Sequence, residues 1–242
     1  MNTLARSLVT GVLLVGLSAG CRQSQLDHFK VWEVKPEPAE RNVKLLGQFD
    51  REPLPTKVEK LVAFANPVNK NNGRIQNENA HLTWYEIARK EPARNVRFEN
   101  QFGSQKWMLY DAKRLLLPAE KKERTLSFPK ELDHFVCYAT DSDQRMRKAV
   151  TLEDQFDRKR RMKEEVRLRP AYFCVPVEKN GEPIQNPRAH LAVYHIDPPS
   201  TLDPPLTIQA DDQFGPHKLT VTKSILPGRT FCEARISRGT MT

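Results

Sequence analysis

This sequence has little glycine and none of the familiar short catalytic motifs. Its 242 residues include only 10 glycines against 18 prolines, a balance that excludes a collagen-like chain. Its soluble composition excludes a polytopic membrane protein, because each span needs about 20 apolar residues. Hydrophobic residues still make up 38% of the chain. That is enough for a packed core and argues against a wholly disordered protein.

No GxSxG, HExxH or CxxC motif occurs, nor a GxxxxGK motif followed by Ser or Thr. Two aspartate pairs, at 141/143 and 211/212, lie in expected loops, where carboxylates form turns more often than acid–base pairs. We therefore expect a protein that is not an enzyme and that holds no cofactor. An enzyme of an unrecognised class stays open as an alternative.

The first 20 residues have the layout of an export signal. Arg6 is their only charged residue, and an apolar run covers 8–17. Cys21 directly follows Ala-Gly, which resembles the lipobox of bacterial lipoproteins. The resemblance implies cleavage before Cys21 and a diacylglycerol on its thiol. Ser18 departs from the Leu that is usual there, so an ordinary signal peptide with Cys21 as a simple thiol is the alternative.

A lipid on Cys21 predicts an exported cell-envelope lipoprotein, on the outer membrane if the host is Gram-negative. One acyl chain anchors a protein weakly, whereas two or three hold it stably. The expected partners are the membrane itself and then an envelope polymer or another envelope protein. Nucleic acid is not an expected partner at this location.

Two short motifs recur four times in step along the rest of the chain, which marks an internal repeat. A His followed by an apolar residue is spaced at intervals of 53, 53 and 56, and a Gln-Phe pair at intervals of 53, 54 and 58. The motifs begin at His28, His81, His134 and His190, and at Gln48, Gln101, Gln155 and Gln213.

Each repeat is expected to form about three strands. In the third repeat Val150, Leu152 and Phe156 are separated by even numbers of residues, so a strand directs them to one face. Repeats one and three begin alike, as do two and four, so a larger unit occurs twice. We predict an all-β fold with two tandem β-sandwich or barrel-like domains, each built from two similar halves of about 50 residues. The expected segments are a signal peptide (1–20), a tether (21–25), the first unit (26–118), a linker (119–131), the second unit (132–234) and a tail (235–242).

The segments 134–138, 150–156 and 173–181 resemble a repeat found in secreted bacterial proteins, catalogued as domain-of-unknown-function family 7450. The resemblance extends over nearly all of 26–232. It implies export and a β-rich repeat, and it implies no activity or mechanism.

Cys137 and Cys174 stand where the first unit has Val31 and Ala65. Joint presence in one unit and joint absence in the other indicate a disulfide formed in an oxidising compartment. Two buried thiols are the alternative. Cys232 aligns with Cys174 but lacks a cysteine at its partner position, so we expect it to be unpaired or to pair outside its repeat.

The repeated histidines are expected to be structural. A zinc site needs three or four converging ligands, whereas each of these residues begins a separate repeat without a local HxH or HxxxH. We expect no metal, and imidazoles that bond a loop carbonyl or the adjacent Asp27 or Asp133. The repeated Phe should lie in the core and the repeated Gln should bond turn backbone.

The chain carries a formal charge of +9, and Arg158, Lys159, Arg160 and Arg161 concentrate positive charge in one expected hairpin. Such a hairpin is a candidate contact for an anionic surface. A solvated hairpin tip is the alternative.

The function these patterns favour is a non-enzymatic structural or binding module on a lipid anchor. A carbohydrate- or peptidoglycan-binding protein is the alternative, because exposed Trp32, Trp84 or Trp107 would stack on sugars. Their places in expected strands favour the core instead.

Overall fold

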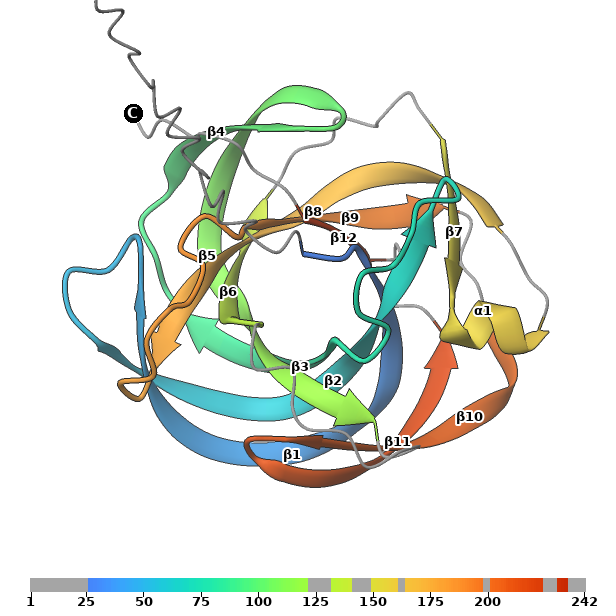
Figure 1. The fold of residues 1–242 in the computed structure, drawn as a ribbon. Helices are drawn as coiled ribbons and strands as arrows, with labels where there is room; N and C mark the ends of the chain where they lie inside the picture. Colours follow the sequence, from blue (N-terminus) through green and yellow to red (C-terminus); the bar gives the residue numbers. More distant parts are fainter. Residues whose placement is uncertain are drawn as a thin grey trace, which may run out of the picture.

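The computed structural model describes residues 26–121, 132–140, 149–160, 164–197, 201–223 and 230–234, which form strands and one short helix (Figure 1). The elements are β1 (Phe29–Gly47), β2 (Leu54–Lys70), β3 (His81–Arg89), β4 (Arg94–Asn100), β5 (Gly103–Lys121), β6 (His134–Thr140), β7 (Val150–Asp154), α1 (Gln155–Arg160), β8 (Glu164–Lys179), β9 (Leu191–Asp197), β10 (Thr201–Asp212), β11 (Gly215–Lys223) and β12 (Thr230–Ala234). The prediction of an all-β fold is confirmed.

Each repeat forms one long antiparallel hairpin with its Gln-Phe pair at the tip. In the first repeat β1 pairs with β2 along nearly its whole length. In the second, β3 and β4 pair with β5, and in the third, β6 and β7 pair with β8. In the fourth, β9 pairs with β12 and β10 with β11. Repeats two to four thus have the expected first and second strands, which β1 merges into one.

The base halves of the four hairpins form a ring. The pairings run β1–β2–β3–β5–β6–β8–β9–β12 and return to β1, all antiparallel. Figure 1 looks into this ring. First strands and returning strands alternate around it, so each repeat contributes the same two neighbours.

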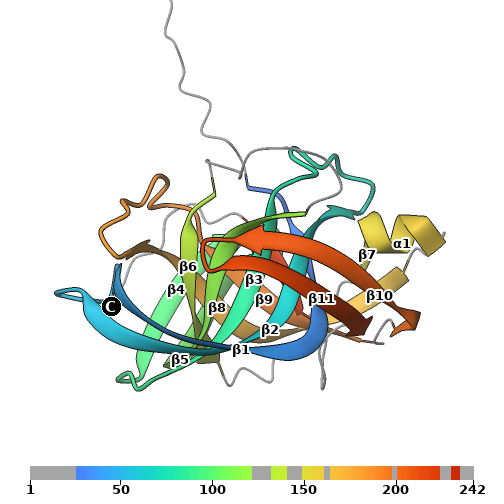
Figure 2. The same ribbon diagram turned by 90° about the horizontal axis from the view of Figure 1, so that it is seen from below.

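The tip halves of the hairpins lie outside the ring and end on the repeat opposite their own. The end of β1, in the first repeat, pairs with the end of β8 in the third, and β7 of the third repeat pairs with β2 of the first. β10 of the fourth repeat likewise pairs with the end of β5 in the second. Figures 1 and 2 show β10 and β11 passing across the outside of the ring strands.

Alternate residues of the ring strands feed two separate hydrophobic cores. One core combines ring residues such as Trp32 and Val34 with tip residues such as Val43 and Leu45. The other core contains small ring residues, including Ala65. Because the tips lie outside the ring, the second core fills its inside. Burying a side chain the size of Leu contributes about 1.5–3 kcal/mol, so both cores contribute to stability.

Both repeat units share this one sheet, whereas the sequence predicts two tandem domains. β5 of the first unit pairs with β6 of the second, and β12 pairs with β1. A separate sheet for each unit would leave edge strands with unpaired backbone groups, and these pairings satisfy them. β5 also continues to Lys121, into the expected linker, and residues 122–131 lie outside the described part of the chain.

Candidate functional site

The four Gln-Phe turns dock on aromatic side chains of the opposite repeat. Each partner is the Trp or Tyr four residues after a repeated His. All four ring pairs are edge-to-face, an arrangement that aromatic quadrupoles favour. The centroid distances are 5.7 Å for Trp32–Phe156, 5.2 Å for Phe49–Tyr138, 5.0 Å for Tyr85–Phe214 and 5.6 Å for Phe102–Tyr194.

The polar end of each of these aromatics reaches the same turn. In three turns, the residue two before the Phe accepts a hydrogen bond from the Phe backbone N–H, as in an Asx turn. The N–O distances are 2.9 Å at Asn100, 2.8 Å at Asp154 and 2.7 Å at Asp212. The same side chains bond Tyr194 Oη at 2.7 Å, Trp32 Nε1 at 2.6 Å and Tyr85 Oη at 2.5 Å, respectively.

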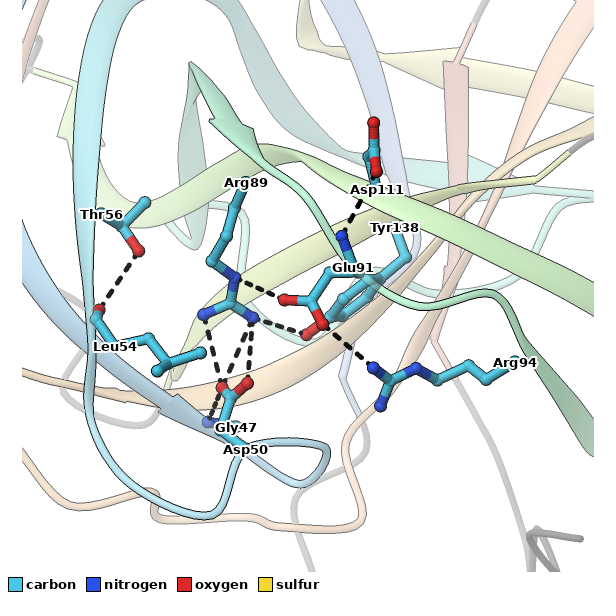
Figure 3. A network of polar contacts seen from close by, with 9 residues as sticks. All are labelled: Gly47, Asp50, Leu54, Thr56, Arg89, Glu91, Arg94, Asp111 and Tyr138. Atoms are coloured by element: carbon cyan, nitrogen blue, oxygen red, sulfur yellow. Dashed lines mark hydrogen bonds and ion pairs between the residues drawn. The ribbon is translucent and has the colours of Figure 1, made fainter.

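The first turn replaces this residue with Gly47 and uses a larger network (Figure 3). Asp50 accepts the Gly47 N–H at 2.8 Å and pairs with the buried Arg89 guanidinium at 3.2 Å. Arg89 also donates to the Tyr138 hydroxyl at 3.0 Å and pairs with Glu91 at 2.7 Å. Arg89 therefore supplies the link between turn and aromatic that Asn or Asp makes directly elsewhere.

A cation packs on the ring of each turn Phe, adding an electrostatic attraction to the docking. The cation-to-centroid distances are 5.2 Å for Lys70–Phe102, 5.5 Å for Lys121–Phe156, 5.9 Å for Lys179–Phe214 and 4.5 Å for Arg94–Phe49. The sequence analysis does not single out these basic residues, because each lies outside the repeated motifs.

The fourth turn also holds a histidine. His217 lies 3.3 Å from Asp212 and 3.1 Å from the Tyr85 hydroxyl. Burial by itself raises the pKa of Asp212, but hydrogen bonds from His217, Thr83 and Tyr85 outweigh it and hold the pKa below its usual value. The same bond to Asp212 raises the pKa of His217. The arrangement stabilises an ionised carboxylate against a protonated imidazole.

The repeated histidines serve as packing groups at the ring. Burial, and then a nearby lysine, lowers the pKa of His28 and His81 to about 3, so both are neutral at pH 7. His81 stacks on Phe64 with centroids 5.1 Å apart. Within the described residues, no group of three or more His, Cys, Asp or Glu side chains is placed to hold a metal.

Asp27 and Asp133 bond a different group from the adjacent histidine that the sequence suggested. Each carboxylate accepts two backbone N–H groups of the loop that follows the returning strand. The N–O distances are 2.7 Å for Gln76 and Asn77 on Asp27, and 2.7 and 2.8 Å for Gln185 and Asn186 on Asp133. This accounts for the Ile-Gln-Asn sequence that both units share.

The repeated Gln residues contact loops of other repeats. Gln155 donates to the backbone carbonyl of Glu78, and Gln213 donates to the Glu182 carboxylate at 2.7 Å. Gln48 bonds His190 at 3.0 Å. The expected bonding to backbone is thus found at Gln155, while side chains are the partners at the other two.

The predicted Cys137–Cys174 disulfide is confirmed. The two residues lie directly opposite each other on β6 and β8. In the first unit Val31 and Ala65 occupy the same register on β1 and β2. On β12, Cys232 lies opposite Val193, as the alignment of the repeats predicted.

The basic run begins inside helix α1 and not in a plain hairpin turn. Asp154 explains the helix, because its side chain accepts the backbone N–H groups of Phe156 and Asp157 at 2.8 and 3.0 Å, as an N-cap does. The exposed Arg158 pairs with Glu78 at 2.9 Å. Lys159 and Arg160 complete the helix, and Arg161 lies outside the described residues, as does Cys21.

All three tryptophans are buried. Trp32, Trp84 and Trp107 are 0%, 1% and 1% exposed. The prediction that they fill cores is confirmed, and none of them is placed to stack on a sugar.

The ring, the outer tips and the docked turns define a class: an all-β protein made of four interlocking hairpin repeats. The chain belongs to the family described as "Repeat of unknown function (DUF7450)", whose model matches residues 81–228, as the sequence resemblance predicted. No curated protein and no solved structure matches the chain. Among the described residues, no helix is long and apolar enough to cross a membrane.

Proposed function

We propose that this protein is a lipid-anchored module of the cell envelope that acts as a rigid scaffold and not as an enzyme. The supporting observation is that the repeated side chains are engaged in contacts between repeats. Every Gln-Phe turn packs on an aromatic of the opposite repeat. The residues that the repeat preserves therefore hold the fold together, and they leave recognition to the variable loops between strands.

The partner we propose is an envelope polymer or another envelope protein. Attachment through Cys21 would place the scaffold beside the membrane, because residues 22–25 are the only sequence between that cysteine and the described fold. The disulfide supports export, since such bonds persist in oxidising compartments. The contacts with buried tryptophans offer no support for sugar stacking, so we propose no carbohydrate site.

The anchor is tested by replacing Cys21 with serine in the full chain. We expect wild-type protein to incorporate labelled palmitate and to sediment with membranes, because each buried CH₂ contributes about 0.8 kcal/mol and two or more chains hold stably. The Cys21→Ser variant should lose the label and accumulate as unprocessed precursor. Cys232→Ser is the matched control and should keep both properties. Wild-type protein without label would contradict the proposal.

A further inference from the structure

A lysine and an aspartate form a fully buried pair between the first and third repeats. Lys30 on β1 and Asp157 in α1 both have side chains that are 0% exposed. The Lys30 Nζ lies 2.7 Å from Oδ1 and 2.6 Å from Oδ2 of Asp157. An ion pair taken wholly out of water carries a desolvation cost that its mutual attraction often fails to offset.

Neighbouring groups fix the positions of both side chains. Lys30 Nζ lies over the Trp32 ring, 4.5 Å from its centroid. Asp157 accepts the backbone N–H of Asp154 at 3.0 Å, and Asp154 in turn bonds Trp32 Nε1. The nucleophilic nitrogen, the acceptor carboxyl and a second carboxyl are thus held together in a site from which solvent is excluded.

Burial, and then the charge of Asp154, raises the pKa of Asp157 to about 7. A carboxyl group with such a pKa takes up a proton readily at neutral pH. The Lys30 ammonium is the nearest proton source, at hydrogen-bond distance. Proton transfer within the pair yields a neutral amine beside a carboxylic acid, which are the reactants of amide formation.

We propose that Lys30 and Asp157 condense to an intramolecular amide cross-link. The amine nitrogen attacks Cγ of Asp157, a C–N bond forms, and one C–O bond of the carboxyl breaks. That oxygen leaves as water with two of the three ammonium protons, so no oxidant, reductant or other reactant is consumed. Asp154 is a positioning residue that keeps Asp157 protonated and relays the proton to the departing oxygen.

The other repeats lack this combination. The positions equivalent to Lys30 hold Thr83, Val136 and Ala192, and those equivalent to Asp157 hold Asp50, Gly103 and Gly215. The cross-link would therefore join the first repeat to the third at one place. It would bridge a sequence separation of 127 residues and bind the two repeat units covalently.

Peptide mass mapping of the full chain, reduced and denatured after purification, tests this directly. Trypsin does not cut after an acylated lysine, so we expect a branched product joining residues 23–41 to 149–158, lighter than the two linear peptides by one water. Cleavage after Lys30, with only linear peptides recovered from folded protein, would overturn the proposal. This result needs no variant and so does not depend on how any variant folds.

Two variants separate the roles of the residues. Lys30→Arg keeps the positive charge but removes the amine nucleophile, and it should give only linear peptides. Asp154→Asn keeps a side-chain oxygen for the turn but cannot carry the proton, so the branched fraction should fall at least tenfold at equal time after synthesis. Equal cross-linking in Asp154→Asn would overturn the role given to Asp154.

Discussion

Replacing Asp212 with alanine is expected to lower the free energy of unfolding by about 4 kcal/mol, because buried donors are left without an acceptor. The Asp212 carboxylate is buried and accepts the Thr83 hydroxyl at 2.6 Å, the Tyr85 hydroxyl at 2.5 Å and the Phe214 N–H at 2.7 Å. The first two donors belong to the opposite repeat. Urea denaturation followed by circular dichroism measures the loss.

Tyr85→Phe is the matched control for this prediction. It removes one hydroxyl from the network and leaves the edge-to-face contact with Phe214 in place, so it should cost about 1 kcal/mol. An Asp212→Ala protein as stable as wild type would mean that the turn is not held by the opposite repeat.

Removing the disulfide by the double substitution Cys137→Ala and Cys174→Ala is expected to lower the free energy of unfolding by about 4 kcal/mol on the chain-entropy model. The bond closes a sequence separation of 37 residues. Both sulfurs lie in the inner core, so alanine also leaves a small cavity. Urea midpoints of oxidised wild type and of the variant measure the difference.

The first unit supplies the reciprocal experiment. Val31 and Ala65 are buried and directly opposed on β1 and β2. The double substitution Val31→Cys and Ala65→Cys should therefore oxidise to a second cross-strand disulfide and raise the urea midpoint, and reduction should reverse the gain. An oxidised protein that keeps two free thiols at these positions would show that the two units do not share this register.

The repeat spacing was enough to predict the strands of each hairpin and the face that each strand buries. Val43, Leu45, Val96 and Phe98 are all buried, as even spacing requires. Spacing within a repeat carries no information on which repeat a tip will reach. That depends on how far each hairpin wraps around the ring, which is set by twist and by register across strands far apart in sequence.

The same limit explains the expectation of two tandem domains. A duplicated sequence is compatible with two sheets or with one, and the outcome depends on whether β5 pairs with β6 and β12 with β1. Local patterns predict that these strands exist and do not determine their neighbours. The disulfide was predictable because the duplication itself acts as a comparison: Cys137 and Cys174 are present together, and both are replaced in the other unit.

The polar residues of the docking sites were missed for a different reason. Lys30, Arg89 and Asp212 are single charges within strands, and such residues usually face solvent. Lys30 did carry a usable signal, because it interrupts the apolar run Phe29 to Trp32, where all neighbours are buried. A charge inside a run that is buried on both faces requires a partner of opposite charge.

A double-mutant cycle between Phe102 and Tyr194 tests most directly that each turn is held by the repeat opposite its own. The two rings belong to the second and fourth repeats, 5.6 Å apart. With leucine at each position, we predict a coupling free energy of about 1 kcal/mol. The cycle between Tyr194 and Phe49, which packs on Tyr138 instead, should give less than about 0.5 kcal/mol. Equal couplings in the two cycles, or none in the first, would contradict the interlocked arrangement.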